Sequence, residues 1–231
     1  MGAEKGSCSV LIEIHPLRFP AQGEEKDKQK IRKTGFYKNH YLEQKMKKQD
    51  KINLIASSIG SKQIVRMYFK YDENYWYFYP NAVSERLMLG QEENDFQLNG
   101  YQIRRISDLV KAEIKDDLCS KIDIWKGIID GIHAPEVDVT SWQTVFRSAE
   151  LQDKCFIIED ENNGVFRIGF IKRAYARYVS LYHFGANGEF DEEQYIFPYS
   201  KITTVSWNTR YTKTWHEYLQ AHDLIPKFVS S

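Results

Sequence analysis

The segment FRIGFIKRAYARYVSLYHFGANGEFDEEQYIFPYSKITTVSW, from Phe166 to Trp207, decides the fold. Short apolar runs alternate with polar residues, and residues typical of turns separate the runs, which predicts a β-meander. The chain has already carried a similar pattern once, from Tyr77 to Ile114. A repeated pattern of this kind predicts how the protein is built, and it says much less about what the protein does.

Alignment of the two segments gives corresponding residues along their whole length. Leu87 and Leu89 fall on Val179 and Leu181, Ile103 on Ile196, Ser107 on Ser200, Leu109 on Ile202, Ala112 on Val205, Ile114 on Trp207 and Leu118 on Tyr211. One inserted residue in the central hairpin is needed. The alternative is a chance alignment of two β-meanders, but the ordered recurrence of a helix, five strands and a tight turn before the last strand favours duplication.

Composition points to a soluble β-rich protein. The 231 residues suffice for one large or two small domains, and the 15 Tyr, 13 Phe and 5 Trp favour strands. Lys plus Arg and Asp plus Glu number 32 each, so the whole chain lacks the charge signature of a nucleic-acid-binding protein. Its longest apolar run is only a few residues, so we expect no membrane span and a cytoplasmic location.

Cysteine usage fits the same compartment. The three cysteines, Cys8, Cys119 and Cys155, lie far apart and show neither metal-ligand nor disulfide spacing. An odd number of cysteines fits a reducing compartment. We therefore expect no zinc site, no disulfide framework and no cofactor.

The sequence divides into five parts by composition. We expect a basic leader over residues 1–50, a first domain over 51–131, a linker over 132–139, a second domain over 140–222 and a tail over 223–231. Between Gln22 and Lys51, ten Lys or Arg oppose five Asp or Glu. Such a stretch can contact nucleic acid or an anionic surface, although charge runs more often stay solvated.

Each expected domain begins with helical patterns. A short helix over 51–60 precedes the first set of strands, and Thr140 with Gln143 fits a capping box for a helix that precedes the second set. Between the domains, Leu118, Ile122, Trp125 and Ile129 share one face of a further expected helix. Asn99–Gly100 is a strong hairpin signal, and Pro80 predicts an edge or a bend. A last helix is expected over 214–222.

In the second copy, Gly169, Ile171 and Leu181 occupy the glycine and apolar positions of an Sm-type pattern. The second copy thus resembles the Sm-like and SH3-like small-barrel superfamily, and the whole is similar to bacterial proteins that carry two such units. The resemblance implies a mainly β fold with short helices, in which two tandem five-stranded small barrels each follow a short helix. Tyr175 and Val179 replace the Asp and Asn of Sm-type RNA sites, so that mode of RNA binding does not carry over.

No motif predicts catalysis. Phosphate loops, dinucleotide fingerprints and nucleophile elbows are absent from the sequence, and the pair His216–Glu217 lacks a second histidine at zinc-protease spacing. Carboxylates cluster in the two central hairpins, with Glu92, Glu93 and Asp95 in the first and Glu189, Asp191, Glu192 and Glu193 in the second. Such residues can bind cations or act as acid and base, but acidic surface loops are the commoner explanation.

Two sets of side chains are candidates for binding. Trp76, Tyr77 and Tyr79 lie in the aromatic-rich strand of the first copy, where alternation exposes about half of the rings. Lys172, Arg173, Tyr175 and Arg177 form a basic patch interleaved with aromatics in the second copy. Exposed aromatics of this kind hold peptides or stack on bases.

Three functions follow, in order of preference. The first is a non-enzymatic binding or adaptor protein with a protein or peptide partner. The alternative is an RNA- or DNA-binding protein that uses the basic leader and the Lys172–Arg177 patch. A small enzyme with a carboxylate site ranks last.

Overall fold

The computed structural model describes residues 46–225, and it is mainly β with short helices, as expected. Most of the basic leader and the end of the tail, residues 1–45 and 226–231, lie outside the described residues. None of the helices between residues 46 and 225 is long and apolar enough to cross a membrane.

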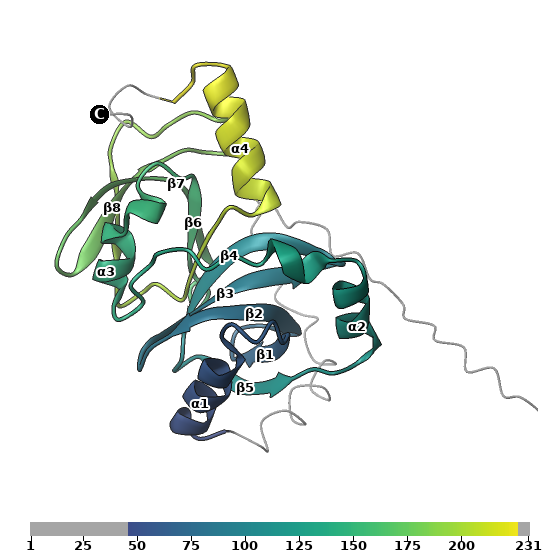
Figure 1. The fold of residues 1–231 in the computed structure, drawn as a ribbon. Helices are drawn as coiled ribbons and strands as arrows, with labels where there is room; N and C mark the ends of the chain where they lie inside the picture. The colour runs from purple at the N-terminus through teal and green to yellow at the C-terminus, as the bar shows by residue number, and fades with distance from the viewer. Residues whose placement is uncertain (1–45, 226–231) are drawn as a thin grey trace, which may run out of the picture.

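Residues 46–225 form two halves, each with a helix followed by five strands (Figure 1). The first half contains α1 (Lys48–Ser58), β1 (Val65–Phe69), β2 (Tyr75–Val83), β3 (Leu87–Asn94), β4 (Gln97–Arg105) and β5 (Leu109–Ile114). The connection contains α2 (Leu118–Trp125) and the short 3-10 helix η2 (Ile128–Gly131). The second half contains α3 (Trp142–Arg147), η3 (Ala149–Leu151), β6 (Phe156–Asp160), β7 (Val165–Ala174), β8 (Tyr178–His183), β9 (Tyr195–Pro198), β10 (Thr204–Trp207) and α4 (Arg210–Ala221).

All ten strands belong to one antiparallel sheet, in the order β5-β1-β2-β3-β4-β10-β6-β7-β8-β9. In each half the fifth strand pairs with the first, so both halves have the same internal strand order. The halves join where β4 pairs with β10, with Ile103 opposite Val205 and Tyr101 opposite Trp207. We call this pairing the seam. The sheet is thus continuous and open.

The register tests the repeat. A β-bulge interrupts the pairing of second and third strands in both halves, between Pro80 and Ala82 and between Ile171 and Arg173. Pro80 therefore marks a bend, since β2 has partners on both sides and is no edge strand. The shared position of the bulge shows that the two halves follow the same strand geometry.

Counting from the bulges confirms part of the alignment. Ile103 corresponds to Ile196, since these residues pair with the equivalent third-strand residues Leu89 and Ser180. Likewise Ala112 pairs with Met67 and Val205 with Ile158, and Ile114 corresponds to Trp207. The expected alignment of Leu87 and Leu89 is wrong by one residue, because the register places Met88 at the position of Val179. Leu87, Met88 and Leu89 are all buried, so apolarity alone could not fix this strand.

The hairpin between β3 and β4 also differs from expectation. Its turn is Asp95–Phe96, where both residues have positive φ, and Asn94 pairs with Gln97. Gly100 instead lies within β4 at φ +76°, where a Cβ would collide with the backbone of Asn208. The absence of a side chain at Gly100 therefore permits close packing at the seam, and this residue does not form the turn.

Helix boundaries shift slightly from those expected. Ser141 and Thr144 form the capping box of α3, one residue later than predicted. The apolar face of α2 does not pack on the core, because the buried residue of this helix is Asp123, while Leu118 and Trp125 are 72% and 81% exposed. The Tyr79 hydroxyl donates to Asp123 Oδ2 at 2.8 Å, and this buried hydrogen bond explains why the polar side of α2 faces the sheet.

Three apolar clusters fill the interior of the part of the chain that the structure describes. The first lies within the first half, where α1 packs against β2 and β5 (Figure 1). A second fills the second half under α3 and continues across the seam to Leu89 and Ile103. The third lies between β6, β7 and α4, where Trp215 and Leu219 face Phe170 and Phe184. Because the second cluster contains residues of both halves, the two halves share part of their core across the seam.

Candidate functional site

A groove of about 740 Å³ lies where the two halves meet. It is lined by Lys48, Glu85, Arg86, Leu87, Arg105, Ser107, Ser141, Trp142, Gln143, Ala176, Tyr199 and Ser200. Four turns meet here: those between β2 and β3, β4 and β5, β7 and β8, and β9 and β10. In the shared strand order these are equivalent turns, two from each half, so both halves contribute to the groove.

Arginines dominate the charge of the groove. Among the described residues, Arg86 and Arg105 make no ion pair. Arg105 reaches across the seam, where its Nη2 donates to the Ser200 carbonyl at 2.9 Å. Neutral carbonyl partners leave the guanidinium charge uncompensated. The single carboxylate of the lining, Glu85, pairs with Lys48 at 2.6 Å in an exposed position.

Aromatic rings and hydroxyls form the rest of the lining. Trp142 is buried at the start of α3, and its ring centroid lies 6.4 Å from that of Phe146, which stacks on Tyr199 at 6.0 Å. Burial raises the pKa of Tyr199 to about 12, so its hydroxyl stays protonated and donates to the Tyr175 carbonyl at 2.9 Å. The groove thus combines fixed positive charge with two aromatic residues, Trp142 and Tyr199, in its lining.

The basic patch expected in the second copy lies partly at this groove. Gln143 Nε2 and the Tyr199 hydroxyl both donate to the Tyr175 carbonyl, and the Tyr199 N–H donates to the Arg177 carbonyl. The turn from Tyr175 to Arg177 is therefore fixed along one rim, and its Arg177 side chain is exposed. Arg173 lies over the Tyr175 ring at 5.3 Å.

Lys172 points elsewhere. It is the extra residue of the β7 bulge, and its Nζ lies 5.2 Å from the Tyr182 ring.

The aromatic set expected in the first copy is divided between two faces of the sheet. Trp76 lies beside Asp72, to which its Nε1 donates at 2.8 Å, and it packs near Arg104. Tyr77 lies on the opposite face, with its ring centroid 5.2 Å from that of Tyr75. Tyr79 is buried under α2. These three residues therefore do not form one surface, and none of them lines the groove.

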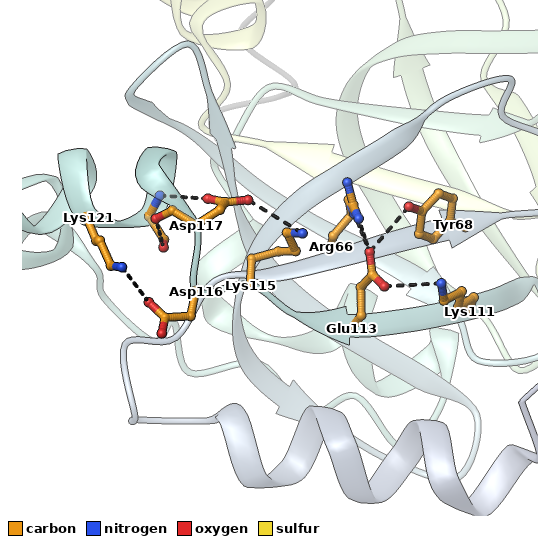
Figure 2. A network of polar contacts seen from close by, with 9 residues as sticks. Arg66, Tyr68, Lys111, Glu113, Lys115, Asp116, Asp117 and Lys121 are labelled. Carbon is orange, nitrogen blue, oxygen red and sulfur yellow. Dashed lines mark hydrogen bonds and ion pairs between the residues drawn. The ribbon is translucent and has the colours of Figure 1, made fainter. Parts of the chain in front are cut away.

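Figure 2 shows a network of charged residues on β1, on β5 and at the start of the connection that contains α2. Glu113 accepts from Arg66 and lies 3.1 Å from Lys111, while Lys115 and Lys121 pair with Asp117 and Asp116. Burial alone would raise the pKa of Glu113, but hydrogen bonds from Arg66 and Lys111 lower it below its usual value. Each cation in this network already has an anionic partner, so the network differs from the groove in offering no uncompensated positive charge.

The acidic hairpins differ from each other. Glu92 and Glu93 lie in β3, where Glu92 is buried and accepts from Gln102 Nε2 at 2.9 Å, so the expectation of a solvated loop is wrong for these two. Burial raises the pKa of Glu93 to about 7. Residues 189–193 form the exposed acidic loop expected in the second half. Within residues 46–225, no group of three or more His, Cys, Asp or Glu is placed to hold a metal ion.

Sequence reasoning missed most of the groove. Ser107 and Ser200, which were aligned with each other, both line it, and the register also places Arg86 at the position of Arg177. Equivalent polar residues in equivalent turns were therefore the available signal. No comparable signal in the sequence marked Trp142, since a buried tryptophan beside a capping box is typical of an ordinary core helix.

Comparisons of the chain with protein-family models, with curated proteins and with solved structures gave no match. The function is therefore inferred from the groove itself.

Proposed function

We propose that each half is a small barrel of the Sm-like and SH3-like kind, and that the pair binds single-stranded nucleic acid in the groove. The barrel assignment is supported by the strand order, since the fifth strand of each half returns to pair with the first. A helix precedes the strands of each half and covers its core, as the small-barrel layout implies.

The observation that carries the binding proposal is the pairing of uncompensated arginines with aromatic rings in one groove. Arg86 and Arg105 can meet phosphates, and the aromatic residues Tyr199 and Trp142 lie in the same lining. Affinity for single strands comes from positive grooves that follow the backbone and from aromatic stacking. The residues involved differ from the Asp and Asn of Sm-type sites, so this is a distinct mode of contact.

A binding role fits the groove better than catalysis. The only carboxylate of the lining, Glu85, is exposed and paired with Lys48, and the remaining polar groups are arginines, serines, a tyrosine and an amide. General acid–base catalysis needs a positioned group that can exchange a proton near neutral pH. Buried Tyr199, with a pKa of about 12, does not meet that need.

The double variant Arg86→Gln, Arg105→Gln tests the proposal. We expect it to weaken binding of a fluorescein-labelled single-stranded RNA about tenfold or more, and to reduce the slope of log affinity against log salt by about 1.4, because two phosphate contacts are lost. Fluorescence anisotropy titrations over a range of salt concentrations measure both quantities.

Lys213→Gln, an exposed cation on α4, is the matched control and should leave both quantities nearly unchanged. Equal losses in control and double variant would contradict the assignment to the groove. So would binding that disappears only when residues 1–45 are removed, because the basic leader would then be the contact.

A second candidate is a binding or adaptor protein with a protein partner. It is favoured by one observation: Leu118, Ile124 and Trp125 on α2 are 72%, 58% and 81% exposed. Exposed apolar groups of this size, tryptophan above all, are typical of protein interfaces. Trp125→Ala separates the candidates, since it would abolish protein binding and leave the groove intact.

A further inference from the structure

Among the described residues, Glu85 is the only carboxylate that lines the groove, and its turn forms equally well without one. The turn between β2 and β3 and the turn between β7 and β8 are closed in the same way. In each, the first N–H donates to the carbonyl three residues on, at 2.8 Å from Ser84 and at 2.9 Å from Tyr175. The register places Ala176 where the first half has Glu85. The carboxylate is therefore not required to build this turn.

The Glu85 carboxylate instead pairs with another member of the lining. Its Oε2 lies 2.6 Å from Nζ of Lys48, the first residue of α1. The two side chains are 69% and 58% exposed, and an ion pair so open to solvent contributes little to stability. Another anion can therefore replace the carboxylate at little cost.

Replacement of Glu85 would not disturb the backbone of the turn. The Ser84 hydroxyl donates to the Val139 carbonyl at 2.7 Å and accepts from the Arg86 N–H at 3.1 Å, which fixes the turn on both sides of Glu85. Only the long, exposed side chain of Glu85 has to rotate away from Lys48. The ion pair can thus open by a change of rotamer alone.

We propose that Glu85 holds Lys48 in a position where a phosphate of the bound strand replaces the carboxylate, so that Lys48 becomes the third cation that contacts nucleic acid. This inference rests on the proposed function of the groove. With Glu85 displaced, Lys48, Arg86 and Arg105 offer three cations in one lining.

The same arrangement selects for a particular class of ligand. A single small anion has to compete with a carboxylate that is covalently held beside Lys48. A chain of linked phosphates first contacts Arg86 and Arg105, and its next phosphate then meets Lys48 at high effective concentration. Glu85 therefore favours a polyanionic strand over a small phosphate-bearing molecule.

A double-mutant cycle on the full chain tests the proposal, with a fluorescein-labelled single-stranded RNA and fluorescence anisotropy. Glu85→Gln should tighten binding about fivefold, because no ion pair has to be broken. Lys48→Gln should reduce the slope of log affinity against log salt by about 0.7, because one phosphate contact is lost. In the Lys48→Gln background, Glu85→Gln should change the affinity by less than about twofold, since the ion pair is already absent.

Glu192→Gln, in the exposed acidic loop of the second half, is the matched control for the loss of one negative charge and should leave the affinity nearly unchanged. The inference is overturned if Glu85→Gln has no effect, if the control tightens binding as much, or if Glu85→Gln has the same effect with and without Lys48. If the Arg86→Gln, Arg105→Gln variant still weakens binding in any of these cases, the groove remains the binding site and only the role of Glu85 is wrong. If neither the wild-type chain nor Glu85→Gln binds the RNA, the proposed function itself fails.

Discussion

Arg104→Met should lower the free energy of unfolding by about 3–5 kcal/mol at neutral pH, because it leaves two partly buried carboxylates without their cation. Arg104 lies in β4 beside the seam and is 1% exposed. Its guanidinium contacts Asp72 at 2.9 Å and Glu161 at 2.5 Å, and it lies 3.9 Å from the centre of the Phe69 ring. One side chain thus joins turns from both halves.

The pH dependence of this variant has a definite sign. Burial raises the pKa of Asp72, and it raises the pKa of nearby Glu159 to about 7. An acid whose pKa is higher in the folded state stabilises the fold below its unfolded pKa, and this contribution disappears as pH rises through the folded value. Without Arg104 these values rise further, so the deficit should be largest above pH about 7 and shrink toward pH about 5.

Denaturant unfolding at several pH values measures the effect. Arg105→Met, the adjacent residue with only carbonyl partners, is the matched control and should cost about 1 kcal/mol. Adding Glu161→Gln to Arg104→Met should recover part of the loss. A small deficit that does not change with pH would contradict the role of Arg104 as the counter-charge of the seam.

Gly169→Ala should destabilise the fold by about 3 kcal/mol or more, because the methyl group has no space. A Cβ on Gly169 would lie against the carbonyl oxygen of Tyr182 on the neighbouring strand β8, and 2.9 Å from its carbonyl carbon. Backbone atoms of a central strand cannot move aside without separating β7 from β8.

Thermal or denaturant unfolding of the alanine variant checks this value. Gly185→Ala is a suitable control, since its Cβ would meet only the flexible Asn187 side chain, and we expect a loss below about 1 kcal/mol. If both variants unfolded alike, the close approach of β7 and β8 would be disproved, and the glycine shared with the Sm-type pattern would have another explanation.

Local patterns predicted the strands and part of the correspondence between the two halves. Alternating apolar residues placed Ile103 on Ile196 and Ala112 on Val205, and the register confirms both pairs. Leu87, Met88 and Leu89 are all buried, so buried and exposed residues do not alternate here. The predicted alignment of this strand with the second half is therefore wrong by one residue. The resemblance to small barrels rested on Gly169, whose close contact with β8 shows that its lack of a side chain is required.

The seam and the groove could not be predicted in the same way. A strand's periodicity states which face is buried, but it does not identify the partner strand, so the pairing of β4 with β10 had no local signal. In the sequence, Arg105 is an ordinary charged residue at the end of a strand. Only the pairing of β4 with β10 places its side chain at the Ser200 carbonyl. The packing of α2 likewise had no local signal, because a tertiary hydrogen bond from Tyr79 to Asp123 turns its polar side toward the sheet.

Photo-crosslinking tests the central claim, that a nucleic-acid strand lies in the groove, most directly. Single-stranded RNA that carries 5-bromouridine is irradiated with the full chain, and the crosslinked residues are mapped by mass spectrometry. We predict crosslinks at Tyr199, Trp142 or Tyr175, the aromatic residues that line the groove or its rim. Crosslinks confined to residues 1–45 or to Trp125 would contradict the account.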